Sequence, residues 1–143
     1  MADFRYRYDA IVREVYDGDT IYADIDLGLD TWKHDIGLRL YGIDTPEVRT
    51  LSSREAGIAA RDFICAALLG IPLEDVGNLP RKRRGSSTRI VLGAVPIFLH
   101  SHGDDDGKYG RLLAEIFVPL GDELVHINKL MLTSGHAKVP SYL

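Results

Sequence analysis

The chain has 143 residues, of which 45% are hydrophobic and 27% charged, as expected for one globular domain with its own core. No apolar run approaches the roughly 20 residues of a membrane-spanning helix, and the single cysteine, Cys65, excludes an internal disulfide. The formal net charge of −4 gives no overall attraction to nucleic acid, so phosphate binding would depend on local basic groups or a bound cation.

Alternating apolar residues predict three consecutive strands in the N-terminal third of the chain, at 6–16, 20–27 and 33–43. The second is the most regular, because Ile21, Ala23, Ile25 and Leu27 fall on one face. Turn residues separate the three segments at 17–19 and 28–30. The pattern therefore predicts an antiparallel meander.

A helix follows the meander. Residues 52–55 form a capping-box pattern, small and apolar residues recur at helical spacing up to residue 68, and Gly70 provides a stop. Cys65 lies among apolar neighbours in this segment, which favours a buried small side chain over a nucleophile. Residues 71–93 are the least legible part, and they contain the basic run Arg81–Arg84.

Two further strands are predicted at 95–100 and 111–118, with a polar turn at 101–108 between them. Asn128 is the predicted cap of a short helix at 129–134, which Gly135 ends. The order of elements predicts an α+β, mainly β fold: a five-stranded Greek-key OB-fold barrel with one long helix after strand 3 and a short C-terminal helix. The chain is predicted to be a single domain, 1–143, with an atypical insertion at about 71–93.

Three clusters of charged residues lie at the ends of these elements. The first is Asp17-Gly18-Asp19-Thr20, the second runs from Arg39 through Asp44-Thr45-Pro46-Glu47, and the third is Lys108-Tyr109-Gly110-Arg111. Each alone is typical of an ordinary turn. Together they suit one task, because carboxylates hold a hard cation while guanidinium groups neutralise a phosphate.

In order and wording, from about Tyr8 to Lys138, the three clusters resemble the staphylococcal (thermonuclease-like) nuclease family. The resemblance implies that Asp19 and Asp44 bind a catalytic Ca²⁺, with Thr45 supplying its backbone carbonyl. Glu47 matches the acid near the attacking water, and Arg39 and Arg111 match the guanidinium groups on the scissile phosphate. The resemblance also places two substrate-binding residues, Lys108 and Tyr109, near a terminal phosphate.

The implied activity is Ca²⁺-dependent hydrolysis of DNA or RNA at the 5′ P–O bond, which leaves 3′-phosphate ends. The candidate ligands are all oxygen atoms, which independently suits Ca²⁺ or Mg²⁺ and disfavours Zn²⁺. The resemblance makes Ca²⁺ the expected ion and Mg²⁺ the less favoured one. The alternative is a non-catalytic OB-fold module that binds nucleic acid or protein. Nucleic acid is the expected partner; no membrane and no obligate protein partner are indicated. The absence of an apolar signal region predicts a cytoplasmic protein, or a secreted one if a leader has been removed.

The C-terminus departs from the family pattern. Two tyrosines expected to pack against the base are absent, with Ser141 and Leu143 in register, and Tyr142 is the candidate substitute. Two further patterns have no role in the family. The tract His100-Ser101-His102 followed by Asp104 to Asp106 resembles a metal-binding tract, although such a turn is more often solvated. Arg81–Arg84 is either a solvated charge run or a phosphate-binding surface.

Overall fold

The computed structural model describes residues 6–104 and 110–141, and within them the chain is mainly β. The strands are β1 (Arg7–Asp17), β2 (Thr20–Asp26), β3 (Trp32–Leu40), β4 (Arg81–Arg84), β5 (Ser87–Asp104), β6 (Leu112–Leu120) and β7 (Glu123–His126). The helices are the 3-10 turns η1 (Leu51–Ser53) and η2 (Leu73–Asn78) and the α-helices α1 (Arg54–Leu69) and α2 (Ile127–Thr133). Among these described elements, no helix is long and apolar enough to cross a membrane.

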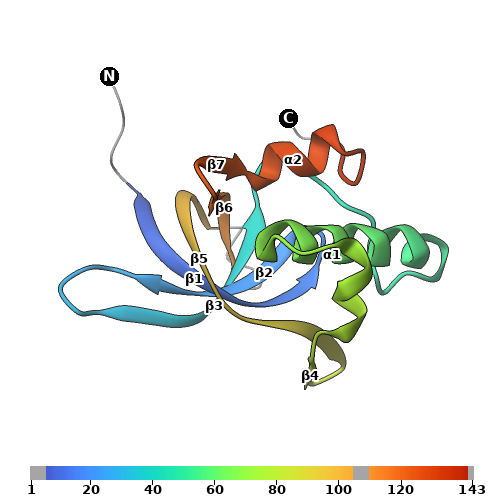
Figure 1. Ribbon diagram of the computed structural model, residues 1–143, viewed down its shortest axis with the longest axis horizontal. Helices are drawn as coiled ribbons and strands as arrows, with labels where there is room; N and C mark the ends of the chain where they lie inside the picture. Colours follow the sequence, from blue (N-terminus) through green and yellow to red (C-terminus); the bar gives the residue numbers. More distant parts are fainter. Residues whose placement is uncertain (1–5, 105–109, 142–143) are drawn as a thin grey trace.

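The sheet curls until it meets itself. β1, β2 and β3 form an antiparallel meander, and β3 then pairs with β6 in parallel. The long strand β5 pairs with β1 along one part and with β6 along another, so that Phe98 faces both Asp9 of β1 and Phe117 of β6. These pairings close a ring of β1, β2, β3, β6 and β5, and the short strands β4 and β7 extend β5 and β6 (Figure 1).

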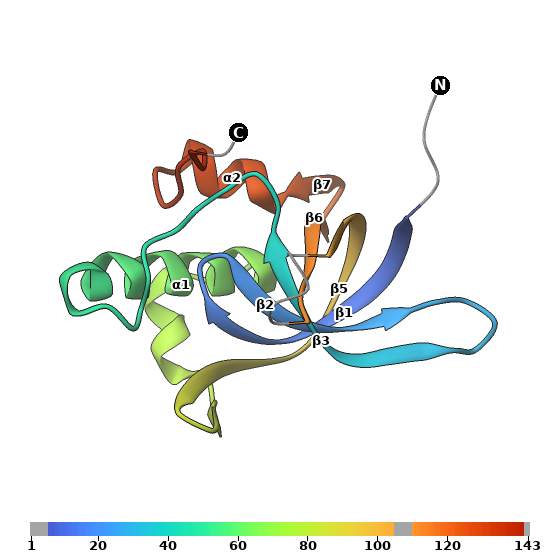
Figure 2. The same cartoon turned by 180° about the vertical axis from the view of Figure 1, so that it is seen from behind.

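The core lies between this curled sheet and α1. Alternate residues of the ring strands are fully buried, and α1 contributes one apolar face; its buried members include Ala60, Ile64, Cys65 and Leu68. Cys65 is 0% exposed, and burial raises its pKa to about 12, so it is the unreactive core residue that its neighbours predict. Figures 1 and 2 show α1 and α2 on one side of the sheet, while the β2–β3 hairpin projects away from them.

The predicted meander and long helix are confirmed, but the strand count is not. Residues predicted as an insertion, 71–93, form η2, β4 and the beginning of β5, so the predicted strand at 95–100 is only the middle part of an 18-residue strand. Gly93 has a φ of +93° where the partner strand β1 changes register, and this irregularity interrupts the alternation on which the prediction relied. The four-residue strand β7 is also absent from the sequence prediction.

Gly70 ends α1 as predicted, but both predicted N-terminal helix caps are wrong. The turn η1 precedes α1, and Ser53 caps α1 without a side-chain bond to the helix; its hydroxyl instead donates to the carbonyl oxygen of Glu47 at 2.8 Å. α2 begins one residue earlier than its predicted cap, so Asn128 lies inside the helix and His126 occupies the cap position.

Asn128 has a tertiary role in place of capping. Its side chain is buried, accepts the N–H of Ile116 at 2.9 Å, and donates to the carbonyl oxygens of Tyr41 at 2.9 Å and Ala114 at 3.0 Å. One amide therefore joins α2 to β6 and to the segment that leaves β3. A tertiary demand of this kind is not visible in local sequence.

We expect Asn128→Ala to lower the free energy of unfolding by about 1–3 kcal/mol or more, because it leaves buried N–H and C=O groups unpaired. The measurement is urea denaturation followed by circular dichroism. The matched control is Asn78→Ala, which changes an exposed amide at the end of η2. Equal stability of the two variants would show that the buried amide contributes nothing.

Candidate active site

The candidate site forms where the β1–β2 turn meets the end of β3. Thr20 pairs with Arg39 in the sheet, and the backbone N–H of Leu40 donates to the carbonyl oxygen of Asp19 at 2.8 Å. The chain then turns at Gly42, whose φ of +79° suits glycine. Asp44 is fixed in turn by two backbone hydrogen bonds with Lys138. The two acidic loops are therefore positioned by backbone pairing.

The guanidinium of Arg39 lies between the two predicted metal-binding carboxylates. Its Nη1 is 2.9 Å from Oδ2 of Asp19, and its Nη2 is 3.1 Å from Oδ1 of Asp44. The N–H of Thr45 donates to the same Asp19 oxygen at 3.1 Å. The side chain of Asp19 is only 8% exposed, whereas that of Asp44 is 45% exposed. The Arg39 guanidinium thus neutralises the buried carboxylate of Asp19 and also contacts the more exposed carboxylate of Asp44.

These residues border a cleft of about 710 Å³. Asp19, Arg39, Glu47 and Arg111 line it, and Nη1 of Arg111 donates to the hydroxyl of Thr20 at 3.4 Å. Asp44 and Thr45 do not line the cleft; they adjoin it through Arg39 and Asp19. The predicted substrate-binding residues Lys108, Tyr109 and Tyr142 lie outside the described residues.

Two glycines of the site allow close approaches that a larger residue would block. A Cβ on Gly57 of α1 would lie 2.8 Å from the backbone carbonyl of Glu47, and one on Gly18 would lie 2.9 Å from the side chain of Ala60. Since such separations are essentially never observed, α1 supports both acidic loops only because these positions lack side chains. Sequence reasoning assigned neither glycine a role.

Asp17 is a further acid of the cleft that received no role from the sequence. It is 5% exposed, and its Oδ1 accepts the backbone N–H of Asp19 at 3.2 Å. Burial, and then the neighbouring Asp19 carboxylate, raise the pKa of Asp17 from 3.8 to about 8. The signal that could have found it is the pair of acids flanking Gly18 in one tight turn. Arg49 and Arg89 also line the cleft without having been predicted.

The donor set fits a hard divalent cation. Asp19 and Asp44 offer carboxylate oxygens on either side of the Arg39 guanidinium, a position where positive charge is already stabilised. The hydroxyl oxygen of Thr45 is buried and has no hydrogen-bond partner among the described residues. No histidine or cysteine is among the described residues that line the adjoining cleft, which favours Ca²⁺ or Mg²⁺ over a softer ion.

We expect Asp17→Asn to stabilise the protein in EDTA more at about pH 9 than at about pH 5. Because the folded-state pKa of Asp17 lies above its unfolded value of 3.8, the folded chain holds a proton that the unfolded chain releases. The free energy of unfolding should therefore fall as the pH rises from about 4 to about 8, and asparagine should remove that slope. Thermal unfolding across this range measures it, with exposed Asp122→Asn as the control. An unchanged slope in Asp17→Asn would contradict the assignment.

Comparison with known proteins gives a distant relationship. No family model matches the chain. It is 28% identical over 141 residues to an uncharacterized protein of Methanocaldococcus jannaschii, an alignment that covers 96% of this chain and 61% of the relative. The chain thus spans about three fifths of the length of the curated relative it matches.

Proposed function

We propose that this chain is a Ca²⁺-dependent nuclease that hydrolyses phosphodiester bonds of DNA or RNA at the 5′ P–O bond and leaves 3′-phosphate ends. The observation that carries the proposal is the Arg39 guanidinium held between Asp19 and Asp44 beside a cleft that also presents Glu47 and Arg111. Carboxylates for a cation, guanidinium groups for a phosphate and an acid for water are the parts that phosphodiester hydrolysis needs.

The proposal includes the staphylococcal nuclease-like family and its five-stranded Greek-key OB barrel. Support comes from the ring of β1, β2, β3, β6 and β5, with β4 and β7 as short additions to it. The parallel pairing of Leu38 with Leu112 is the feature that matters for the site, because it brings β3 and the beginning of β6 together. Arg39 and Arg111, 72 positions apart in the printed sequence, then line one cleft.

The side chains divide the reaction between them. Arg39 and Arg111 bind the nonbridging oxygens of the scissile phosphate and neutralise the charge that grows there as water attacks. Glu47 positions that water or takes its proton while the P–O5′ bond breaks. Asp19, Asp44 and Thr45 would hold the cation, which supplies Lewis-acid stabilisation of the phosphate when bound.

Arg39 has two kinds of partner in this scheme, carboxylates and the phosphate. In the structure it neutralises Asp19 and Asp44, and in the reaction it binds phosphate. A cation bound by the two carboxylates would take over their neutralisation and release the guanidinium for the substrate. The proposal therefore links metal binding to the availability of Arg39 without requiring any movement of the strands.

The decisive experiment is a nuclease assay on single-stranded DNA, duplex DNA and RNA with Ca²⁺, Mg²⁺ or EDTA. We expect hydrolysis with Ca²⁺ and none with EDTA. Arg39→Ala and Arg111→Ala should each lower kcat by roughly 10³-fold, the scale of a lost phosphate-stabilising guanidinium, and lysine should restore little because it cannot form two parallel hydrogen bonds. Arg61→Ala, on α1 beside Asp62, is the control.

Two results would overturn the proposal. Full activity in a folded Arg39→Ala or Arg111→Ala variant would remove that residue from the mechanism. If the chain binds nucleic acid but hydrolyses none with either Ca²⁺ or Mg²⁺, that result would favour the alternative, a non-catalytic OB-fold binding module.

The basic strand β4 supplies a candidate surface for the rest of the substrate. All four residues of Arg81–Arg84 are exposed, and Ser86 and Ser87, which follow the strand in the same hairpin, line the cleft. Lys82 and Arg84 lie 3.9 Å and 3.8 Å from Glu14, but Arg89 remains 3.0 Å from that carboxylate as its closer partner. Charge can therefore be removed from β4 while Glu14 keeps its nearest cation.

We expect the triple variant Lys82→Thr, Arg83→Thr, Arg84→Thr to have a higher KM for long DNA and an unchanged kcat. Removal of three positive charges takes the formal net charge from −4 to −7. The slope of log KM against log salt should flatten by up to about 0.7–0.9 per lost phosphate contact, since fewer counterions are released on binding. A dinucleotide-sized substrate is the control, because it should not reach β4. If the variant kept the KM of the parent and its salt dependence, β4 would be a solvated strand that does not contact the substrate.

A further inference from the structure

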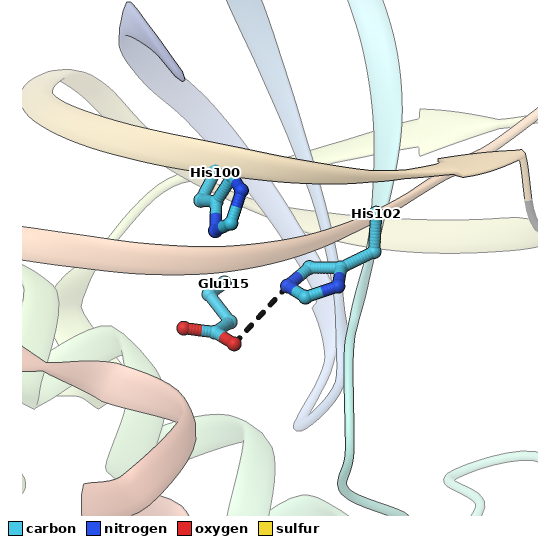
Figure 3. Close-up of side chains that lie close together, drawn as sticks. All are labelled: His100, His102 and Glu115. Carbon is cyan, nitrogen blue, oxygen red and sulfur yellow. Dashed lines mark hydrogen bonds and ion pairs between the residues drawn. The ribbon is translucent and has the colours of Figure 1, made fainter. Parts of the chain in front are cut away.

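A second cluster of potential metal ligands lies on the β5–β6 pair. His100 of β5 faces Glu115 of β6 directly in the antiparallel register, and His102 follows two residues later on the same strand. Figure 3 shows the three side chains converging, with the dashed line joining His102 to Glu115. One ligand atom from each residue can be chosen so that all lie within 4.8 Å of one another.

We propose that His100, His102 and Glu115 form a binding site for a borderline divalent transition metal, with Zn²⁺ as the best fit, distinct from the oxygen site of Asp19 and Asp44. Two imidazoles and one carboxylate are a common ligand set for Zn²⁺ with one position left open, and imidazole favours Zn²⁺ over Ca²⁺ or Mg²⁺. The same chain would then separate two ions by ligand chemistry, with carboxylate oxygens for one and imidazole nitrogens for the other.

The geometry requires only side-chain adjustment. Nε2 of His102 is 3.1 Å from Oε1 of Glu115. Ligand atoms bound to Zn²⁺ at about 2.0–2.1 Å in a tetrahedron lie about 3.3 Å apart, so this pair is already at the required separation. The metal would replace the hydrogen bond between His102 and Glu115, and His100 would rotate toward them from its fixed strand position.

Neighbouring rings brace the cluster. The ring of Tyr41 stacks on that of His102, with centroids 3.9 Å apart and planes 7° from parallel. On the other side, Nε2 of His126 lies 3.5 Å from Oε2 of Glu115, and Phe117 stacks on His126 at 4.5 Å. That buried His126 nitrogen makes no hydrogen bond to any described residue. A small side-chain adjustment would let His126 Nε2 donate a hydrogen bond to Glu115 and position its carboxylate from outside the ligand set.

The site would also tie together the two ends of one connection. His102 precedes and Glu115 follows the segment that carries Arg111, which lines the proposed catalytic cleft. A metal at this cluster would join β5 to β6 by side chains just where the register of their pairing shifts, between Ser101 and Asp104. Its expected effect is on stability of the strand pair, independent of phosphodiester hydrolysis.

The test is titration of the metal-free protein with Zn²⁺ by calorimetry, in an Asp44→Ala background so that the oxygen site cannot take the ion. We expect one Zn²⁺ per chain and a rise in Tm on binding. Co²⁺ should give the visible absorption of a tetrahedral nitrogen–oxygen site. His102→Ala and Glu115→Gln should abolish binding, while His34→Ala, an exposed histidine paired with Asp24, should not. His126→Ala should weaken binding by about 10- to 100-fold, as expected of a residue that orients a ligand.

Glu115→Gln keeps the shape of the side chain, so it remains informative if His102→Ala fails to fold. Saturable Zn²⁺ binding of parental affinity in Glu115→Gln would overturn the proposal, and so would the absence of saturable binding in the Asp44→Ala parent. Because Asp44→Ala is inactive under the proposed function, neither result depends on nuclease activity. A protein that hydrolyses DNA but binds no Zn²⁺ would refute this site alone.

Discussion

The carboxylate of Asp19 joins the two loops from which the candidate site is built. It comes from the β1–β2 turn, accepts the N–H of Thr45 from the loop after β3, and forms an ion pair with Arg39. A carboxylate that is only 8% exposed is costly unless charge and hydrogen bonds compensate it. The loop after β3 supplies that compensation, so its conformation and the position of the Asp19 carboxylate depend on each other. Asp17, beside it in the same turn, has little compensation left, which is why burial favours its protonated form.

The residues that were predictable from sequence are those whose role is set by local pattern. Alternation places Ile21, Ala23 and Ile25 in the core, and the three charged clusters name Asp19, Arg39 and Arg111 before any geometry is known. What local pattern cannot predict is how one residue serves distant partners. In sequence, Asn128 has the position of a helix cap, but its side-chain amide forms hydrogen bonds that join α2 to β6 and to the segment after β3. Strand β5 is divided by Gly93, and its first part pairs with β4 and β1 through contacts between strands that local pattern does not reveal.

His100 and His102 show the same limit of local sequence pattern. His100 and His102 form a recognisable pair in sequence, and the acids nearest to them in sequence, Asp104 to Asp106, have side chains that lie outside those the structure describes. Glu115, thirteen residues beyond His102, completes the cluster because the β5–β6 register carries it back. A polar turn and a metal site therefore look alike until strand pairing is known.

The ring closure at β5 has a consequence for how the protein folds. The meander of β1, β2 and β3 needs only short turns, but Leu38 must find Leu112 and Tyr8 must find Leu99 across most of the chain. Loop-closure entropy opposes such distant pairings, so we expect the meander to form early and the ring to close late and slowly. Arg39 and Asp19 belong to the early half, and Arg111 to the late half. Under the proposed function, a partly folded chain would therefore hold Asp19 and Arg39 in place before Arg111 arrives and before Lys138 fixes Asp44, so hydrolysis would begin only once the ring has closed.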